Sequence, residues 1–348
     1  MQLVLVRPVR RRNPFSLEKL PLLARLYRRP FDKFKTLGRV ALFGAPNFAL
    51  FFLWRRLFPF GGRGVFKLAL PAGERRIEFN ARNTQFSALY FSCFQHGYEV
   101  HVNALLDVLL PDDGVFVDVG SNWGWFPLYV ASRPGFHGRV HAFEPFPSTF
   151  ADLTSVVTQA GLNERVRCHA VALSDKSGHA TMSLPDGFQS GLAVMSEDGP
   201  GKGEGIATTP LDALEDLGPV SLMKIDAEGA ELKVLRGARV TIAKHRPMIV
   251  LESGRRFEQP ELTLGPLRLL RELGYVFFNL GWLRKDSGHP YLLGDDHYLA
   301  MQPEEIFCLT QFEVEERFQR QDGMNLLACH RDRLAELETL FTRWQPPA

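Results

Sequence analysis

The most constraining feature of the sequence is a succession of apolar runs that begins at Gly114. Each run is followed by a turn, and most turns lead into a segment with helical spacing. The runs read "VFVDV", "VHAF", "VRCHAVAL", "VSLMKI" and "MIVLES". Because strands that alternate with helices pair in parallel, the pattern predicts an α/β fold with a mainly parallel sheet and helices on both faces.

Around this core the sequence predicts three further segments. The turn-rich stretch "PFGGRG" ends a basic, aromatic-rich N-terminal extension, residues 1–64. Strands and a helix are expected over residues 65–113, ahead of a core over 114–302. A C-terminal segment, residues 303–348, is predicted to be partly helical, with the helix at Arg331–Trp344.

Charge is distributed unevenly along the chain. Residues 1–60 contain 13 Lys/Arg and two acids, which gives 13 − 2 = +11. Basic and aromatic residues together favour peripheral contact with an anionic membrane; a solubilising tail, or an arm folded onto the acidic body, is the alternative. The apolar stretch Val40–Trp54 has 15 residues, whereas a span needs about 20. We expect no nucleic-acid partner.

The cysteines and the N-terminus bear on the cellular compartment. The four cysteines form no CxxC pair, so the sequence favours a reducing cytosol over a disulfide framework or a zinc site. No uninterrupted apolar stretch near the start precedes a small-residue cleavage site, as a signal peptide would require. The prediction is a cytoplasmic protein, with peripheral binding at the inner membrane face through residues 1–60.

The turn after the first apolar run, in "VFVDVGSNWGWF", has the position of a ligand-binding turn. Dinucleotide sites use G-x-G-x-x-G there, but this turn has only Gly120 and Gly124, with Asn122 at the second glycine position. Asp118, at the strand end, would face the ligand. Like charges ~4 Å apart repel by about 4 kcal/mol at an effective dielectric near 20, so a cationic ligand is favoured over a pyrophosphate.

S-adenosylmethionine meets this description, because it carries a sulfonium and an ammonium and no phosphate. Glu144 lies 24 positions after Gly120, close to the spacing of the acid that accepts ribose hydroxyls. The alternatives are a turn-capping role for Asp118 and a solvated strand end for Glu144.

Several motifs together resemble the FkbM-type methyltransferases. They are "FVDVGSNWGWF", "HAFEPFPSTFADL", "VALSDKSG", "TPLDAL", "LMKIDAEGAELKVLRGA" and "RPMIVLES", within Gly97–Gly281. The resemblance implies a class I, Rossmann-like methyltransferase that uses S-adenosylmethionine, and an O-methyltransferase acting on a hydroxyl of a sugar, a lipid-linked saccharide or a secondary metabolite. The predicted cofactor-binding residues are Asp118, Gly120, Ser121, Asn122, Gly124, Glu144 and Ser174.

The acidic residues of "KIDAEGAE" are the candidate catalytic and acceptor-binding residues. Asp226 and Glu228 lie at the same carboxyl-end edge as Gly120, and we predict that they orient and deprotonate the acceptor. Predicted acceptor contacts are Glu231, Glu252 and His96, although Glu231 could instead interact with its own helix N-terminus. A divalent cation is possible among these acids, but nothing in their spacing requires one.

Two other functions remain open at this point. A nicotinamide-dependent oxidoreductase on the same kind of sheet would need the missing glycine and room for a pyrophosphate. A non-catalytic, membrane-associated binding protein would keep the fold without turnover. The glycine-rich stretch Gln189–Gly205 is either a mobile lid or a plain surface loop.

Overall fold

The computed structural model describes residues 2–5, 13–33, 37–57, 62–91, 94, 97–183, 194–196, 203–283, 290–291 and 306–343. Two predictions fall wholly or mostly outside these ranges. His96 lies outside them, as does most of the proposed lid Gln189–Gly205.

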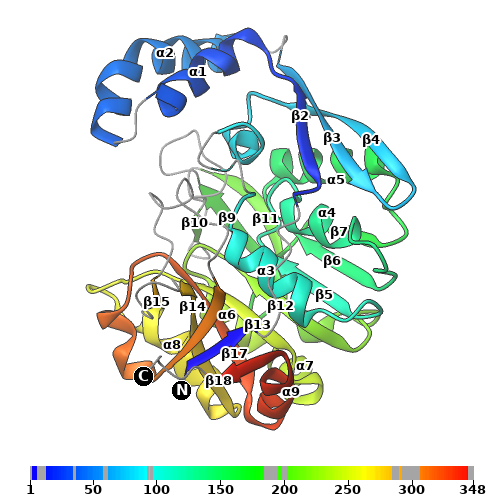
Figure 1. Cartoon of the computed structure of the whole chain (residues 1–348), viewed down its shortest axis with the longest axis vertical. Coiled ribbons are helices and arrows are strands. Elements are labelled where there is room, and N and C mark those ends of the chain that lie inside the picture. Colours follow the sequence, from blue (N-terminus) through cyan, green and yellow to red (C-terminus); the bar gives the residue numbers. More distant parts are fainter. Residues whose placement is uncertain are drawn as a thin grey trace.

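One large sheet organises the described part of the chain (Figure 1). Its strands are β1 (Gln2–Leu5), β5 (Val115–Val119), β6 (Arg139–Phe143), β7 (Val166–His169), β12 (Val220–Ile225), β13 (Met248–Ser253), β14 (Tyr275–Leu283), β15 (Pro290–Tyr291), β16 (Ile306–Phe312), β17 (Met324–His330) and β18 (Phe341–Arg343). Their order is β18-β1-β16-β14-β17-β13-β12-β5-β6-β7, with β15 on β14. The five strands from β13 to β7 are parallel, as predicted, and the others are antiparallel.

Helices cover both faces of the parallel strands. Successive side chains of a strand point to opposite faces, so apolar residues of one strand pack on the helices of both sides. On β5, Phe116 packs in one hydrophobic core, and Val117 and Val119 pack in the other. The first core also contains residues of several helices, among them a set of three beside the parallel strands, and the second contains residues of three others. The first set is α3 (Val100–Leu109), α4 (Trp125–Ala131) and α5 (Pro147–Ala160), and the second is α6 (Glu231–Gly237), α7 (Arg239–His245) and α8 (Pro260–Glu272).

Two smaller sheets and a helical hairpin complete the described fold. β2 (Phe15–Lys19), β3 (Arg63–Leu70) and β4 (Gly73–Asn80) form a three-stranded antiparallel sheet. A second sheet has the order β10-β9-β11-β8 and consists of β8 (Ala172–Leu173), β9 (Gly178–Ser183), β10 (Val194–Ser196) and β11 (Glu204–Thr209). Helices α1 (Leu22–Lys33) and α2 (Leu37–Leu57) lie side by side at one end of the molecule (Figure 1).

The predicted segment boundaries do not coincide with these sheets. β1 belongs to the N-terminal extension in sequence, yet it pairs with β16 and β18 in the main sheet. β17, from the C-terminal segment, lies between β13 and β14 in the middle of that sheet. Pairing between strands far apart in the sequence leaves no local signal, so turn-rich stretches alone did not reveal it.

Two predicted helices are shorter than expected. The helical segment expected after the fourth apolar run, beginning near Glu231, is divided into α6 and α7 at Ala238, next to Gly237. A Cβ at Gly237 would overlap the carbonyl oxygen of Ser174, so a glycine, which weakens a helix, is required here by packing. At the C-terminus the predicted helix is α9 (Leu334–Leu340), preceded by a 3₁₀ turn and followed by β18.

The close approach of the segments after β5 and β12 gives a stability prediction. Gly120 has a φ of +77°, and a Cβ there would overlap the carbonyl oxygen of Asp226. We expect Gly120→Ala to lower the free energy of unfolding by about 2–4 kcal/mol, from left-handed backbone strain and overpacking. Gly205→Ala is the matched control, because no atom lies within 4 Å of its added Cβ. Equal denaturation midpoints for the two variants would contradict this packing.

Candidate active site

The site lies where the direction of strand addition reverses in the sheet. From β5 the chain adds β6 and β7 on one side, and it returns to place β12 and β13 on the other side. In sheets of this kind, ligands bind beyond the carboxyl ends of the strands at this reversal. The turn after β5 is fixed by the backbone amides of Gly120 and Ser121, which both donate to the carbonyl oxygen of Phe143 at 3.0 Å.

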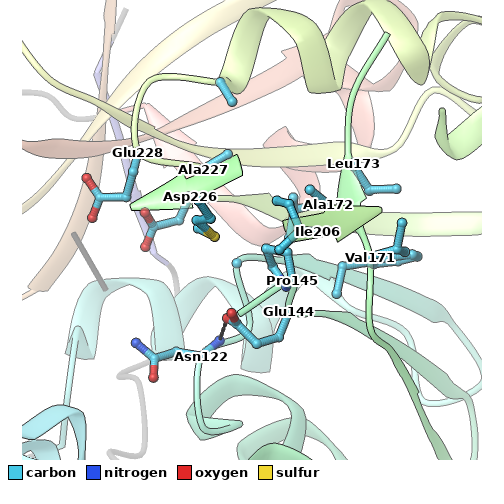
Figure 2. Close-up of a pocket in the computed structure, with 15 residues that line it drawn as sticks. Asn122, Glu144, Pro145, Val171, Ala172, Leu173, Ile206, Asp226, Ala227 and Glu228 are labelled. Atoms are coloured by element: carbon cyan, nitrogen blue, oxygen red, sulfur yellow. Dashed lines mark hydrogen bonds between the residues drawn. The ribbon is translucent and has the colours of Figure 1, made fainter. Parts of the chain in front are cut away.

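A pocket opens at this position, with one apolar side and one acidic side (Figure 2). The apolar side includes Val171, Ala172, Leu173 and Ile206, and the polar side includes Asn122, Glu144, Asp226 and Glu228. No lysine or arginine is among the described residues that line it. The pocket therefore offers an apolar surface for a flat ring and carboxylates for hydroxyl or cationic groups, and no basic side chain for a phosphate.

Glu144 is held in place by the backbone around it. Its carboxylate accepts a hydrogen bond from the amide of Asn122 at 2.9 Å (Figure 2) and another from the amide of Phe146, also at 2.9 Å. Burial raises the pKa of Glu144 to about 7, although these two amides oppose the increase. The alternative of a solvated strand end is therefore not what the structure shows: Glu144 is 6% exposed and lines the pocket.

Asp118 differs from its prediction, because its side chain does not line the pocket. It is fully buried, and it lies directly beside Lys224 in the register of β5 and β12. Its neighbour Val119 lines the pocket instead, since adjacent side chains of a strand point to opposite faces. Burial raises the pKa of Asp118 to about 6, and the Lys224 ammonium opposes this.

The other predicted cofactor residues divide into two groups. Gly120 and Asn122 line the pocket. Ser121, Gly124 and Ser174 are not among its lining residues. Ser121 donates its hydroxyl to the Asp118 carbonyl oxygen at 2.9 Å, Gly124 begins α4 at a φ of 99°, and the buried Ser174 donates to the Asp175 carboxylate at 3.4 Å. These three residues shape the turns that surround the pocket.

Lys224 is a residue of the site that the sequence analysis missed. It is 1% exposed, and its Nζ donates to Asp226 Oδ2 at 2.9 Å and lies 4.8 Å from the centre of the Phe126 ring. Burial alone would raise the pKa of Asp226, but the Lys224 ammonium holds it below its usual value. The signal was present in "KIDAEG", because residues two apart on a strand share a face.

Glu228 and Glu252 complete an acidic cluster with Asp226. Carboxylate oxygens of the three residues lie within 4.8 Å of one another. The charge of Asp226, together with burial, raises the pKa of Glu252 to about 10. Burial, and the charges of Asp226 and Glu231, raise the pKa of Glu228 to about 7. Glu228 also has a φ of 49°, a strained backbone conformation of the kind found at functional sites.

A second, more polar pocket lies on the other side of Glu228. It is lined by Glu228, Gly229, Glu231, Glu252, Gly254, Arg255, Arg256, Leu262, Asp322 and Gly323. The predicted contacts Glu231 and Glu252 are therefore both in its wall. Glu231 Oε1 also accepts hydrogen bonds from the amides of Ala227 and Gly229, at 3.1 and 3.0 Å, as expected if it supports its own helix start. Glu228 lines both pockets.

Comparison with known proteins agrees with this geometry. Residues 112–277 match the Methyltransferase FkbM domain. The chain is 33% identical over 210 residues to 31-O-demethyl-FK506 methyltransferase FkbM of Streptomyces tacrolimicus, an alignment that covers 49% of this chain and 74% of that protein. The chain belongs to the FkbM methyltransferase family. Its strands β7-β6-β5-β12-β13-β17-β14 form the class I, Rossmann-like core.

Two further similarities are partial. The chain is 27% identical over 223 residues to AMB antimetabolite synthetase AmbE of Pseudomonas aeruginosa, and it spans only 10% of that much longer protein and 53% of itself. The crystal structure of methyltransferase FkbM from Methylobacillus flagellatus KT matches with a TM-score of 0.36 and 19% identity. That match covers 57% of this chain and 44% of the other.

The buried ion pair gives a prediction for this FkbM-family chain. Replacing Lys224 with Met leaves buried carboxylates without their cation, so we expect the free energy of unfolding at pH 7.5 to fall by about 3–5 kcal/mol. Because the folded-state pKa of Asp226 is lowered, the pair stabilises above the unfolded pKa of about 3.9, and its contribution is lost as pH falls through the folded value. The loss in free energy of unfolding caused by Lys224→Met should therefore be smaller at acidic pH.

Urea unfolding at several pH values measures this. Lys244→Met, at an exposed position of α7, is the control and should change stability little. A deficit that is small, or that does not change with pH, would show that Lys224 does not neutralise this cluster.

Proposed function

We propose that the protein transfers a methyl group from S-adenosylmethionine to a hydroxyl of a sugar, a lipid-linked saccharide or a secondary metabolite. The observation that carries the proposal is the position of Glu228, whose side chain lines both the cofactor pocket and the second pocket. A carboxylate in the wall that the two pockets share is within reach of the methyl group in one pocket and of an acceptor in the other.

The composition of the first pocket supports S-adenosylmethionine over a nicotinamide dinucleotide. Adenine fits against the apolar side formed by Val171, Ala172 and Leu173, and Glu144 is placed to accept the ribose hydroxyls. Asp226 and Glu228 favour a cationic ligand at the remaining edge. A pyrophosphate would meet these acids with no basic side chain among the described lining residues. When bound, the cofactor supplies an electrophilic methyl on its sulfonium.

The second pocket supports an acceptor rich in hydroxyl groups. Arg255 and Arg256 provide donors, and Glu252 and Asp322 provide acceptors or shared protons. Few apolar side chains line it, with Leu262 the largest. The relative from Streptomyces tacrolimicus is named for O-demethyl-FK506 as its substrate, which is consistent with a hydroxyl acceptor in this family.

The three acids are suited to different tasks. The carboxylate of Glu228, with its pKa raised to about 7, is the general base, because a base works best with a pKa near the operating pH. Asp226, with its lowered pKa and its ion pair to Lys224, is a weaker base and orients the acceptor. Glu252 is protonated at neutral pH and donates a hydrogen bond. Alignment of acceptor and methyl can contribute roughly 7–11 kcal/mol.

A divalent cation is not required for this arrangement. Asp226, Glu228 and Glu252 have the oxygen ligands that Mg²⁺ or Ca²⁺ prefers. However, the Lys224 ammonium already pairs with Asp226 at 2.9 Å and offsets its negative charge. We therefore propose methyl transfer without a bound metal, with the proton of the acceptor hydroxyl passing to Glu228.

Cofactor identity can be measured by calorimetry. We expect S-adenosylhomocysteine to bind and NAD not to bind. Glu144→Gln should weaken S-adenosylhomocysteine binding by about 1.5–3 kcal/mol, or roughly 10- to 150-fold, because a charged hydrogen-bond acceptor is lost. Glu215→Gln, at an exposed position, serves as the control. Micromolar NAD binding without S-adenosylhomocysteine binding would favour the oxidoreductase alternative instead.

The role of Glu228 predicts a pH-dependent rate. Labelled S-adenosylmethionine, screened against saccharides and hydroxylated secondary metabolites, supplies the acceptor for the assay. Turnover should rise with pH through about 7, because Glu228 must lose its proton to act as a base. Glu228→Gln should lower turnover at least 100-fold and remove this rise, with a smaller effect on S-adenosylhomocysteine affinity.

Two comparisons make this assay decisive. Glu258→Gln, at an exposed position, should keep the wild-type profile. A Glu228→Gln variant that retains both rate and profile, while Asp226→Asn is inactive, would assign the base to Asp226. Treatment with EDTA should leave turnover unchanged; loss of turnover restored by Mg²⁺ would identify the three acids as a metal site.

A further inference from the structure

The outer face of the α1–α2 hairpin carries an apolar stripe. Five of the eight large hydrophobic side chains that are exposed in the described part of the chain lie on these two helices. Leu50, Leu53 and Leu57 of α2 are 49%, 52% and 57% exposed, and Phe43 is 59% exposed. Their spacings of seven, three and four residues place them along one side of the helix. Leu22 of α1, 69% exposed, is the fifth.

The opposite face of the hairpin belongs to the protein core. Phe51 and Trp54 of α2 are 0% and 7% exposed, and Tyr27 of α1 stacks on Phe51 with ring centroids 4.2 Å apart. Tyr27 also contacts Phe91, which comes from outside the hairpin. The hairpin is therefore anchored through its inner face, so the exposed leucines are held in a fixed position and are not part of a loose tail.

Basic residues accompany the apolar stripe. Residues 22–57 contain eight Lys/Arg and one acid, Asp32, which gives 8 − 1 = +7. The basic residues that are exposed in the described part of the two helices are Arg25, Arg29, Lys33, Arg39 and Arg56. Leucines together with a high density of basic residues are typical of helices that lie in a membrane interface.

We propose that the α1–α2 hairpin docks the protein onto the surface of an anionic lipid bilayer through Leu50, Leu53 and Leu57. The positive charge of the hairpin favours an anionic bilayer over other partners. Each Lys or Arg near an anionic surface adds to the attraction, and salt screens this attraction. A second copy of the chain on the same stripe would bring two such charges of the same sign together, so pairing between copies is disfavoured.

Docking on the surface also agrees with the dimensions of the helices. Within the ranges that the structure describes, no helix has both the length and the apolarity needed to cross a bilayer. α2 has 21 residues, but Pro46 and Asn47 interrupt its apolar sequence. An in-plane orientation needs only one apolar face, and the hairpin that carries the exposed leucines lies at one end of the molecule (Figure 1).

Co-sedimentation of the full-length protein with vesicles tests this proposal. The vesicles are pure phosphatidylcholine or phosphatidylcholine with one third phosphatidylglycerol, each at low and high salt. We expect binding to the anionic vesicles at low salt, weaker binding at high salt, and little binding to the neutral vesicles. Leu50→Ser with Leu53→Ser should weaken binding at least tenfold, because apolar area no longer enters the interface. Deletion of residues 1–60 is unsuitable, since it would remove Phe51 and Trp54 from the core.

A matched pair of substitutions controls for general loss of exposed apolar surface. Val240→Ser with Phe257→Ser changes two side chains that are 66% and 65% exposed outside the hairpin, and this variant should bind as the wild type does. Circular dichroism melts establish that both variants fold. The proposal is overturned if the wild type does not bind anionic vesicles at low salt, or if the Leu50/Leu53 variant binds equally well. It is also overturned if sedimentation shows a dimer that the Leu50/Leu53 variant abolishes.

Discussion

The buried ammonium group of Lys224 is the centre around which the acids of the site are arranged. Asp118 lies beside it in the register of β5 and β12, and Asp226 contacts it at 2.9 Å. Burial opposes its charge, but the carboxylates of Asp226, of Glu99 at the start of α3 and of Asp118 raise the pKa of Lys224, so it remains charged. One buried cation thus offsets several buried anions, which could not remain together without it.

The consequence of this ion pair is a division of roles among neighbouring carboxyl groups. Asp226 is kept ionised by Lys224, and its negative charge raises the pKa of both Glu252 and Glu228. Groups of one chemical type thereby obtain different protonation states at the same pH. The backbone places Glu228, whose pKa is raised to about 7, in the walls of both pockets.

Sequence patterns predicted the local parts of this structure and missed the parts that depend on distant pairing. Strand–turn–helix alternation indicated the five parallel strands, and the pocket residues Gly120, Asn122 and Glu144 followed from the turn and its spacing. The direction of the Asp118 side chain depends on the pleat of β5, which a strand-end rule does not specify. The position of β17 beside β13, which brings Asn325 opposite Glu252, required a contact between segments about 70 residues apart.

A crystal structure of the protein with S-adenosylhomocysteine would show whether Glu228 lies between the cofactor and the acceptor. We expect the adenine against Val171, Ala172 and Leu173, the ribose hydroxyls on Glu144, and the sulfur directed toward Glu228, with the second pocket open beyond it. A ligand bound elsewhere, or one whose sulfur points away from Glu228, would contradict the assignment of that residue to the wall between cofactor and acceptor.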